Sequence, residues 1–373
     1  MRSQSAQPPE GPLGFGEPLP FFSAETDGAA KYALDVAAGR WFVLMAFGSL
    51  AHAASAAAHA EVLEARALFD DEDASFFGIS ADPADRQRVR NVEPGLRYFW
   101  DFDRRVSALL GVVGPTHFNP TSFLIDRSLR VSAAVTIEQT GALLQHLRGL
   151  LATEKAVAEP PHAPVLMLER VFEPELCDRL TAYFKAAGGE ASGFASDVQG
   201  RTVTVVDARF KRRSDVTIAD PDLLASVRER LSRRLFPLVR RAFGWQATEI
   251  ERDLICEYRA DDLGFFSAHR DDATAGTAHR KFAVTVNLND DYEGGALRFR
   301  EFGPRLYRPS KGGAAVFSCS LLHEATPVTA GVRYALVPFL YDEAGARLRR
   351  ANLAQVEGAA GTNRKARRAQ GRR

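Results

Sequence analysis

The chain has 373 residues, of which 46% are hydrophobic and 25% are charged. This composition excludes a fibrous or wholly disordered protein and allows two folded domains. The formal net charge is +1, which also excludes a protein that binds polyanions through its overall charge. The last 25 residues, 349–373, hold eight basic residues and one acidic residue, and we predict that they form a disordered basic tail.

The chain contains three cysteines, Cys177, Cys256 and Cys319, which lie far apart in the sequence. This spacing supplies neither a disulfide framework nor a CxxC redox or zinc site, and it is typical of the reducing cytosol. We therefore expect a cytoplasmic protein. Cys256 and Cys319 lie in predicted strands and are expected to be inert core thiols. Residues 1–16 lack the apolar core of a signal peptide, and no apolar run reaches the roughly 18 residues of a membrane helix, so no membrane insertion is expected.

The first half of the chain alternates predicted strands with predicted helices. A continuous apolar run at residues 41–47 (WFVLMAF) indicates a buried strand, and an alanine-rich helix is predicted after it, over 51–69. Three further strands and a closing helix are expected at residues 75–80, 121–126, 130–136 and 138–151. Strands and helices in this order predict a compact α/β layer.

Three prolines within residues 160–164 mark a linker, which we place at 155–164. It separates a first domain, residues 1–154, from a second domain, residues 165–348. The second domain begins with two predicted amphipathic helices, one opening at Pro174 and one over 221–243. Beyond them, short alternating segments separated by Gly and Pro turns predict the strands of a jelly roll, so this domain is expected to be α+β.

The first domain resembles the thioredoxin-like fold, and within it the peroxiredoxins. The resemblance rests on the segments GEPLPFF, WFVLMAF, FFGISADP and NPTSFLIDRSLRV. In that family the peroxidatic cysteine stands at the start of the helix after the first long strand, where this chain reads FGSLAHAAS at residues 47–55. No cysteine precedes Cys177, and the chemistry requires a thiolate. The resemblance therefore implies a cysteine-free thioredoxin-like sandwich with a docking or structural role.

Candidate metal ligands lie in the strand region of the second domain. His269 and Asp271 are two residues apart, a spacing that predicts one shared face of a strand, and His323 follows 52 residues after Asp271. Two histidines and a carboxylate form the facial triad of non-heme Fe(II) sites, which leaves coordination positions open. Arg333 lies in an alternating strand and suits the far carboxylate of a dicarboxylic acid, and the Tyr258 hydroxyl could point at that carboxylate.

The segment from about 165 to 342 resembles the Fe(II)/2-oxoglutarate dioxygenases, most of all the prolyl 4-hydroxylase branch. The resemblance rests on VFEPELCDRLTAYF, YEGGALRF, PSKGGAAVFS and LLHEATPVTAGVRYAL, in the family's order. It implies a double-stranded β-helix (jelly roll) with supporting helices. In such a domain His269, Asp271 and His323 would bind Fe(II) and act in catalysis. Arg333 and Tyr258 would bind 2-oxoglutarate, whereas Asn287 lies nearby and is not assigned to the site.

The resemblance implies a hydroxylase that uses O₂ and 2-oxoglutarate and releases succinate and CO₂. The expected target is a prolyl residue or an amino-acid-like group, in a peptide, a protein or a small molecule, and ascorbate is a further candidate cofactor. The alternative is a non-catalytic metal-holding binding or sensor protein built from two degenerate enzyme domains. Arg333 argues against this alternative, because a structural metal site has no use for a cosubstrate anchor.

Two peripheral features carry further expectations. The tail sequence NRKARRAQGRR suggests weak, salt-sensitive contact with RNA or a membrane surface. It has no aromatic residue to stack on bases, so a solvated tail without a partner is favoured. His279 lies in the loop 272–281, where we expect a solvated side chain, and this loop is long enough to cover the metal.

Overall fold

The computed structural model describes residues 11–114, 117–154, 161–198 and 201–356. The chain divides into two compact units, Met1–Pro161 with Arg300–Pro304, and His162–Phe299 with Arg305–Arg373. Residues 155–160 of the predicted linker and residues 357–373 of the predicted tail lie outside the described residues. Within the ranges that are described, every helix is too short or too polar to cross a membrane.

The first unit is built on a seven-stranded sheet with the order β2-β1-β5-β4-β3-β6-β7. Its strands are β1 (Ser23–Thr26), β2 (Ala29–Ala33), β3 (Trp41–Gly48), β4 (Ala74–Ser80), β5 (Leu96–Trp100), β6 (Thr121–Ile125) and β7 (Val131–Thr136). Its helices are α1 (Ala53–Glu64), α2 (Arg105–Leu109) and α3 (Thr140–Glu154). Strands β3, β4 and β5 run parallel, and β6 and β7 continue the sheet antiparallel.

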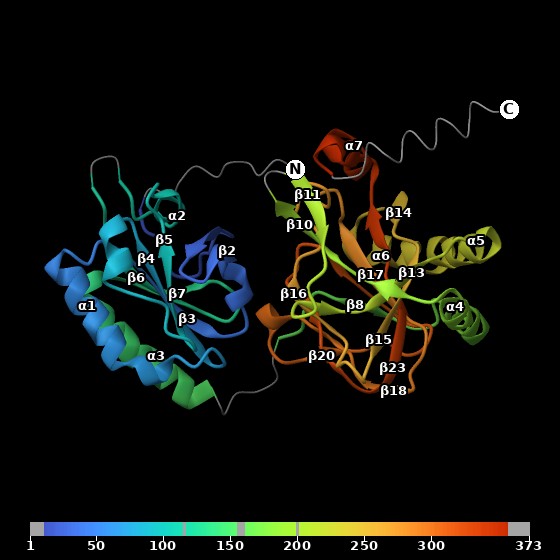
Figure 1. Cartoon of the computed structure of the whole chain (residues 1–373), viewed down its shortest axis with the longest axis horizontal. Helices are drawn as coiled ribbons and strands as arrows, with labels where there is room; N and C mark the ends of the chain where they lie inside the picture. Colours follow the sequence, from blue (N-terminus) through green and yellow to red (C-terminus); the bar gives the residue numbers. More distant parts are fainter. Residues whose placement is uncertain (1–10, 115–116, 155–160, 199–200, 357–373) are drawn as a thin grey trace. The chain divides into compact units, whose positions relative to one another are not determined.

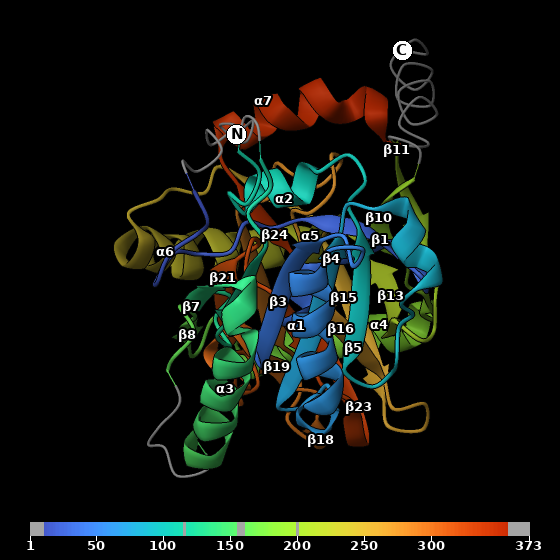
Figure 2. The same cartoon turned by 90° about the vertical axis from the view of Figure 1, so that its left-hand side faces the viewer.

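Strand β3 is apolar along its length because both of its faces are covered. On one face, Val43 and Met45 pack into a core with Val62 of α1 and Leu147 of α3. Figures 1 and 2 show these two helices side by side over that face of the sheet. On the other face, the ring of Phe42 meets that of another buried aromatic residue in β4. The predicted buried strand and the helix after it are confirmed, although α1 ends at Glu64.

The second unit contains sheets of two, five and ten strands, paired antiparallel throughout. Its strands are β8 (Leu166–Leu168), β9 (Glu190–Ala191), β10 (Phe194–Val198), β11 (Arg201–Val205), β12 (Lys211–Arg212), β13 (Ser214–Thr217), β14 (Glu249–Glu251), β15 (Leu254–Arg259), β16 (Phe265–His269), β17 (Phe282–Asn287), β18 (Tyr292–Gly294), β19 (Leu297–Arg298), β20 (Leu306–Tyr307), β21 (Ala314–Ser318), β22 (His323–Ala325), β23 (Val328–Leu336) and β24 (Phe339–Tyr341). Its helices are α4 (Pro174–Ala187), α5 (Pro221–Arg230), α6 (Phe236–Phe243) and α7 (Glu343–Asn352), and a π-helical segment, Leu231–Leu235, joins α5 to α6.

The five-stranded sheet, β12-β16-β22-β19-β20, and the larger sheet line one cavity between them. The outer face of the larger sheet packs against α4, α5 and α6. Of these helices, α4 and α5 are seen to one side of the strands in Figure 1. Because side chains alternate along a strand, β23 sends Tyr334 and Leu336 into this outer core and Arg333 into the cavity. Two antiparallel sheets with supporting helices agree with the jelly roll that the sequence predicts.

The end of the described chain differs from the prediction. Helix α7 continues to Asn352 and is followed by a 3₁₀ turn, Leu353–Gln355, so the predicted boundary of a disordered tail at residue 349 is wrong. The helix begins at a cap in which Asp342 accepts a hydrogen bond of 2.7 Å from the backbone N–H of Gly345. The basic residues near its end favour this helix, since cations stabilise a helix C-terminus.

Candidate metal centre

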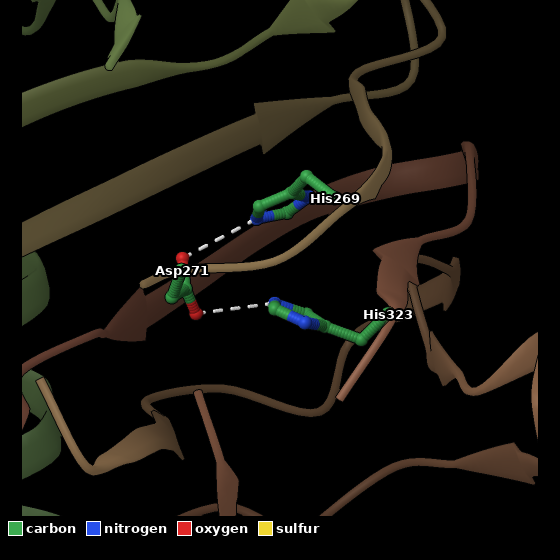
Figure 3. Close-up of side chains that lie close together, drawn as sticks. All are labelled: His269, Asp271 and His323. Atoms are coloured by element: carbon green, nitrogen blue, oxygen red, sulfur yellow. Dashed lines mark ion pairs between the residues drawn. The ribbon is translucent and has the colours of Figure 1, made fainter. Parts of the chain in front are cut away.

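The structure brings His269, Asp271 and His323 together, as Figure 3 shows. His269 ends β16, His323 begins β22, and the two residues are direct partners in the antiparallel pair. Asp271 lies between the imidazoles, with Oδ1 3.5 Å from Nε2 of His269 and Oδ2 3.3 Å from Nε2 of His323. One donor atom from each residue lies within 4.8 Å of the others, so a single metal ion can contact all three.

Both imidazoles are oriented through their Nδ1 atoms. Nδ1 of His269 lies 2.7 Å from the carbonyl oxygen of Ser267, and Nδ1 of His323 lies 3.0 Å from that of Leu321. A carbonyl oxygen can only accept, so each Nδ1 carries the proton and each Nε2 presents a lone pair. Metal-binding histidines use this tautomer and this type of backbone partner. The donor set, two neutral imidazoles and one carboxylate, therefore fits Fe(II).

A β-bulge in β16 sets the position of His269. Phe266 pairs with Ala325 and His269 pairs with His323, so three steps along β16 oppose two steps along β22. In a regular strand, residues three apart face opposite sides, and the extra residue brings Phe266 and His269 to the same side. Their rings stack with centroids 3.6 Å apart. The bulge thus supplies a packing surface that restrains the imidazole.

Asp271 reaches the centre by a different route from the predicted one. Strand β16 ends at His269, and Asp271 lies in the turn that follows, so strand alternation does not place these two side chains together. The N–H of Asp271 donates instead to the carbonyl oxygen of Cys319 at 2.9 Å, which fixes the turn beside the start of β22. The expectation of a shared centre holds, and the expectation of a shared strand face is wrong.

Burial and close neighbours together control the ionisation of these groups. Burial lowers the pKa of His269 to about 4, and the neighbouring His323 acts in the same direction. Burial acts to raise the pKa of Asp271, but the close contacts with His323 and His269 outweigh it and hold that pKa well below its usual range. At neutral pH the centre therefore offers a neutral His269 beside a carboxylate, which is the state a dication needs.

Arg333 and Tyr258 lie across from each other in the larger sheet, where β23 pairs with β15. The guanidinium carbon of Arg333 is 5.4 Å from the centroid of the Tyr258 ring, and both side chains line the cavity that holds the metal-ligand candidates. Burial raises the pKa of Tyr258, so its phenol stays protonated. The structure brings these two residues to one place; their contact with 2-oxoglutarate stays a prediction.

The Arg333 guanidinium is buried among neutral acceptors. The residue is 3% exposed, and its Nη2 donates to Thr285 Oγ1 and to Asn287 Oδ1, each at 3.1 Å. Among the described residues, no carboxylate forms an ion pair with it. A buried cation without a counter-ion is unfavourable, so an anion in the cavity would stabilise this arrangement. Thr285 and Asn287 hold the guanidinium plane, a role that the sequence did not assign to them.

The loop that follows Asp271 is a support for the centre. His279 is 2% exposed, and its Nε2 lies 2.6 Å from Glu251 Oε2, so the predicted solvated side chain is wrong. Arg280 forms an ion pair of 2.9 Å with the same carboxylate and donates to the carbonyl oxygen of Asp271 at 3.3 Å. Glu251 lies in β14, a strand of the larger sheet. That sheet therefore holds the end of this loop in place through His279 and Arg280.

The first unit shows no thiol at the position where a peroxiredoxin carries its cysteine. The hydroxyl of Ser55 is buried and donates to the carbonyl oxygen of Phe47 at 2.9 Å, and Ser49 donates to Asp82 at 2.6 Å. Both hydroxyls therefore serve local hydrogen bonds. The three cysteines of the chain all lie in the second unit. Cys256 and Cys319 are buried, as the sequence predicted, and Cys177 is buried as well.

Comparisons with curated proteins connect the chain to hydroxylases. No family model matches the chain. A segment of 98 residues is 34% identical to the multifunctional procollagen lysine hydroxylase and glycosyltransferase LH3 of Rattus norvegicus and covers 25% of this chain and 12% of that protein. A segment of 89 residues is 35% identical to a PKHD-type hydroxylase of Azoarcus sp., covering 22% of this chain and 39% of the relative. The chain thus spans well under two thirds of these relatives.

Solved structures with similar folds fall into two groups. A prolyl hydroxylase from Trichoplax adhaerens has 16% identity and a TM-score of 0.38, over 50% of this chain and 86% of its own. The peroxidoxin BcpB of Mycobacterium tuberculosis has 20% identity and a TM-score of 0.32, over 39% of this chain and 99% of its own. Sequence similarity over about a quarter of the chain thus links it to lysyl hydroxylases that use 2-oxoglutarate and to PKHD-type hydroxylases.

Proposed function

We propose that the second unit is an Fe(II)- and 2-oxoglutarate-dependent hydroxylase. It would use O₂ to hydroxylate a prolyl residue or an amino-acid-like group and would release succinate and CO₂. The observation that carries this proposal is the placement of the three candidate metal ligands and a buried Arg333 around one cavity. The curated relatives named above support the same reaction class. We propose in addition that the first unit is a non-catalytic docking or structural module and that the protein is cytoplasmic.

The residues of the chain divide the work between metal and cosubstrate. His269, Asp271 and His323 would hold iron through two Nε2 atoms and a carboxylate oxygen. Iron bound there supplies the oxygen-activating chemistry of this reaction class. Arg333 would bind the far carboxylate of 2-oxoglutarate, and the protonated Tyr258 would donate a further hydrogen bond. The apolar rings of Phe266, Phe317 and Phe339 line the same cavity and limit the entry of water.

A metal-holding sensor or binding protein is the competing function. Such a protein needs the three ligands, but it gains nothing from a buried guanidinium that lacks a counter-ion. Oxygen-dependent formation of succinate from 2-oxoglutarate separates the two functions, because a sensor would form none. Stimulation of this turnover by ascorbate would show whether that reductant also serves the enzyme.

The full chain with Fe(II) and 2-oxoglutarate, kept free of oxygen, should show a visible charge-transfer band. His269→Ala and Asp271→Ala should abolish the band, because each removes one ligand of the metal that carries the chelated cosubstrate. Asp261→Ala is the matched control, since this carboxylate is 62% exposed and pairs with Arg259. A band that persists in both ligand variants, or that the wild-type chain never shows, would refute the proposal.

A further inference from the structure

Two arginines line the cavity without a part in the proposed reaction, namely Arg213 and Arg252. Arg213 lies between β12, which pairs with β16 in the smaller sheet, and β13, which pairs with β15 in the larger one. The chain crosses from one sheet to the other at this residue. Arg252 lies between β14 and β15 with a positive φ of 67°, a conformation that a non-glycine residue adopts only at a cost.

These two arginines share a single carboxylate. Nη2 of Arg213 lies 2.7 Å from Asp215 Oδ2, and Nη2 of Arg252 lies 3.3 Å from the same oxygen. The Arg213 side chain is only 5% exposed, and its buried Nε has no hydrogen-bond partner. The pair therefore keeps one positive charge without a counter-ion and at least one buried donor without an acceptor. Both features are unfavourable unless a ligand satisfies them.

A third basic residue, Lys211, lies next to this pair and shows the sign of the local potential. Lys211 is 4% exposed, and its Nζ donates at 2.7 Å to Ser192 Oγ and to the carbonyl oxygen of Gly193, both neutral acceptors. Burial and, next, the charge of Arg213 lower the pKa of Lys211 to about 6. Burial and the same neighbour lower the pKa of Arg252 to about 10. The region thus disfavours any further positive charge and favours an anion.

Arg213, one member of the pair, and Arg333 are neighbours around one aromatic ring. The guanidinium carbons of Arg213 and Arg333 lie 5.9 Å and 5.4 Å from the centroid of the Tyr258 ring. In the proposed reaction, the charges of Fe(II), Asp271, Arg333 and 2-oxoglutarate cancel. The excess charge of Arg213 and Arg252 over Asp215 then remains in the cavity after the metal and the cosubstrate have bound.

We propose that Arg213 and Arg252 form a second oxyanion subsite, which binds a carboxylate or phosphate group of the molecule that is hydroxylated. This inference rests on the proposed function and adds a substrate class to it, that of anionic substrates. The planar forks of two guanidinium groups suit both oxyanions, which they can bind with paired hydrogen bonds. The subsite also separates the roles of the arginines, with Arg333 for the cosubstrate and this pair for the substrate.

The test uses the full chain loaded with Mn(II), a paramagnetic ion that suits the same donor set, and saturated with 2-oxoglutarate. The probes are carbon-13-labelled acetate and inorganic phosphate, with acetamide as the neutral counterpart of acetate. Enhanced nuclear relaxation reports a probe held near the metal. Acetate, phosphate or both should show it and acetamide should not, and the probe with the larger effect identifies the preferred oxyanion.

Arg252→Gln should reduce the enhancement at least about fivefold, because it removes one of the two forks. Arg209→Gln is the matched control, since that side chain is 90% exposed and pairs with Asp207. Arg213→Lys provides a second variant should Arg252→Gln unfold, and circular dichroism establishes folding. The affinity for 2-oxoglutarate should stay within about twofold in Arg252→Gln.

Equal enhancement in the wild type and Arg252→Gln would mean that the probes bind the metal itself, and it would overturn the subsite. The absence of enhancement with both probes in the wild type would overturn it as well. Loss of 2-oxoglutarate affinity in Arg252→Gln would assign the arginine to the cosubstrate instead. The hydroxylase proposal fails separately if the wild type binds no Mn(II). In that case, the thermal unfolding midpoint of the wild type is measured with and without acetate or phosphate. A rise in the midpoint that Arg252→Gln abolishes supports the subsite, and the absence of any rise in the wild type refutes it.

Discussion

Replacing Arg333 with glutamine tests the cosubstrate anchor directly. The variant keeps a planar amide near Thr285 and Asn287 but removes the charge and one arm of the fork. A hydrogen bond to a charged group contributes about 1.5–3 kcal/mol, and a residue with 3% exposure receives little screening from salt. Loss of one such bond to 2-oxoglutarate corresponds to an increase of about 10- to 150-fold in its KM.

Arg333→Lys refines the same test. It keeps the positive charge but presents a single point donor, which cannot hold both neutral acceptors and a carboxylate in one plane. We expect about a tenfold increase in the KM for 2-oxoglutarate, smaller than for glutamine. The assay is oxygen-dependent succinate formation at varied 2-oxoglutarate, with Arg209→Gln as the control for loss of an exposed guanidinium.

The result that refutes this reasoning is a KM for 2-oxoglutarate that changes less than about threefold in Arg333→Gln while succinate still forms. The carboxylate would then bind elsewhere, and the buried guanidinium would be structural. Thermal unfolding of each variant shows whether a change in KM accompanies a loss of fold. A variant that melts near the wild-type temperature and has a raised KM supports the anchor.

Two further predictions concern the ionisation of buried groups. Burial lowers the pKa of Lys211 to about 6. Above that pH the folded protein loses a proton that the unfolded chain keeps. The free energy of unfolding of the wild type therefore rises by up to ~1.4 kcal/mol per pH unit until the pH reaches the ordinary lysine pKa. Lys211→Met removes this rise, so urea denaturation should show the variant losing stability relative to the wild type as the pH goes from about 6.5 to about 9. A difference in unfolding free energy between the two proteins that stays constant over this pH range would contradict the lowered pKa of Lys211. All three cysteines are buried, and burial raises the pKa of Cys177 to about 12, so a thiol reagent should label none in the native protein and three in urea. Rapid labelling without urea would contradict this.

The sequence predicted the candidate metal ligands because their signal lies in residue type and spacing. His269, Asp271 and His323 stand among alternating segments, and the structure places them together. The reason given for the first two was incomplete, since alternation within a strand cannot reveal that β16 contains a bulge and ends before Asp271. A bulge depends on pairing with a distant strand, which a local pattern does not report.

The arginine pair was not predictable from the sequence. Arg213 lies in the segment KRRSD, whose composition is typical of a solvated loop. Its place in the cavity follows from two strand pairings, of Lys211 with Phe266 and of Asp215 with Cys256, that join segments more than 40 residues apart. Long-range pairing of this kind produces no periodic pattern in the local sequence, so the burial of these charges is seen only in the three-dimensional structure.

The strands missed in the first unit have local reasons as well. Strand β5 (LRYFW) is buried on both faces without a clean two-residue period, and β1 and β2 are short and largely polar or small. The buried strands β3 and β4 were predictable because long apolar runs carry their own signal. The fold was therefore clearest in the middle of the sheet and least clear at the edge formed by β1 and β2.

The bulge in β16 has a consequence for the proton on His269. The two residues inside the bulge, Ser267 and Ala268, have no partner in β22, and the carbonyl of Ser267 accepts from Nδ1 of the histidine. Nδ1 of His323 contacts the carbonyl of Leu321 in the same way, two residues before it, so in β16 the bulge leaves the corresponding carbonyl within reach of His269. Loss of such an orienting partner typically weakens metal binding by about 10- to 100-fold. A backbone carbonyl inside the bulge, contributed by a residue outside the candidate metal ligands, thus selects the nitrogen of His269 that is free to bind a metal.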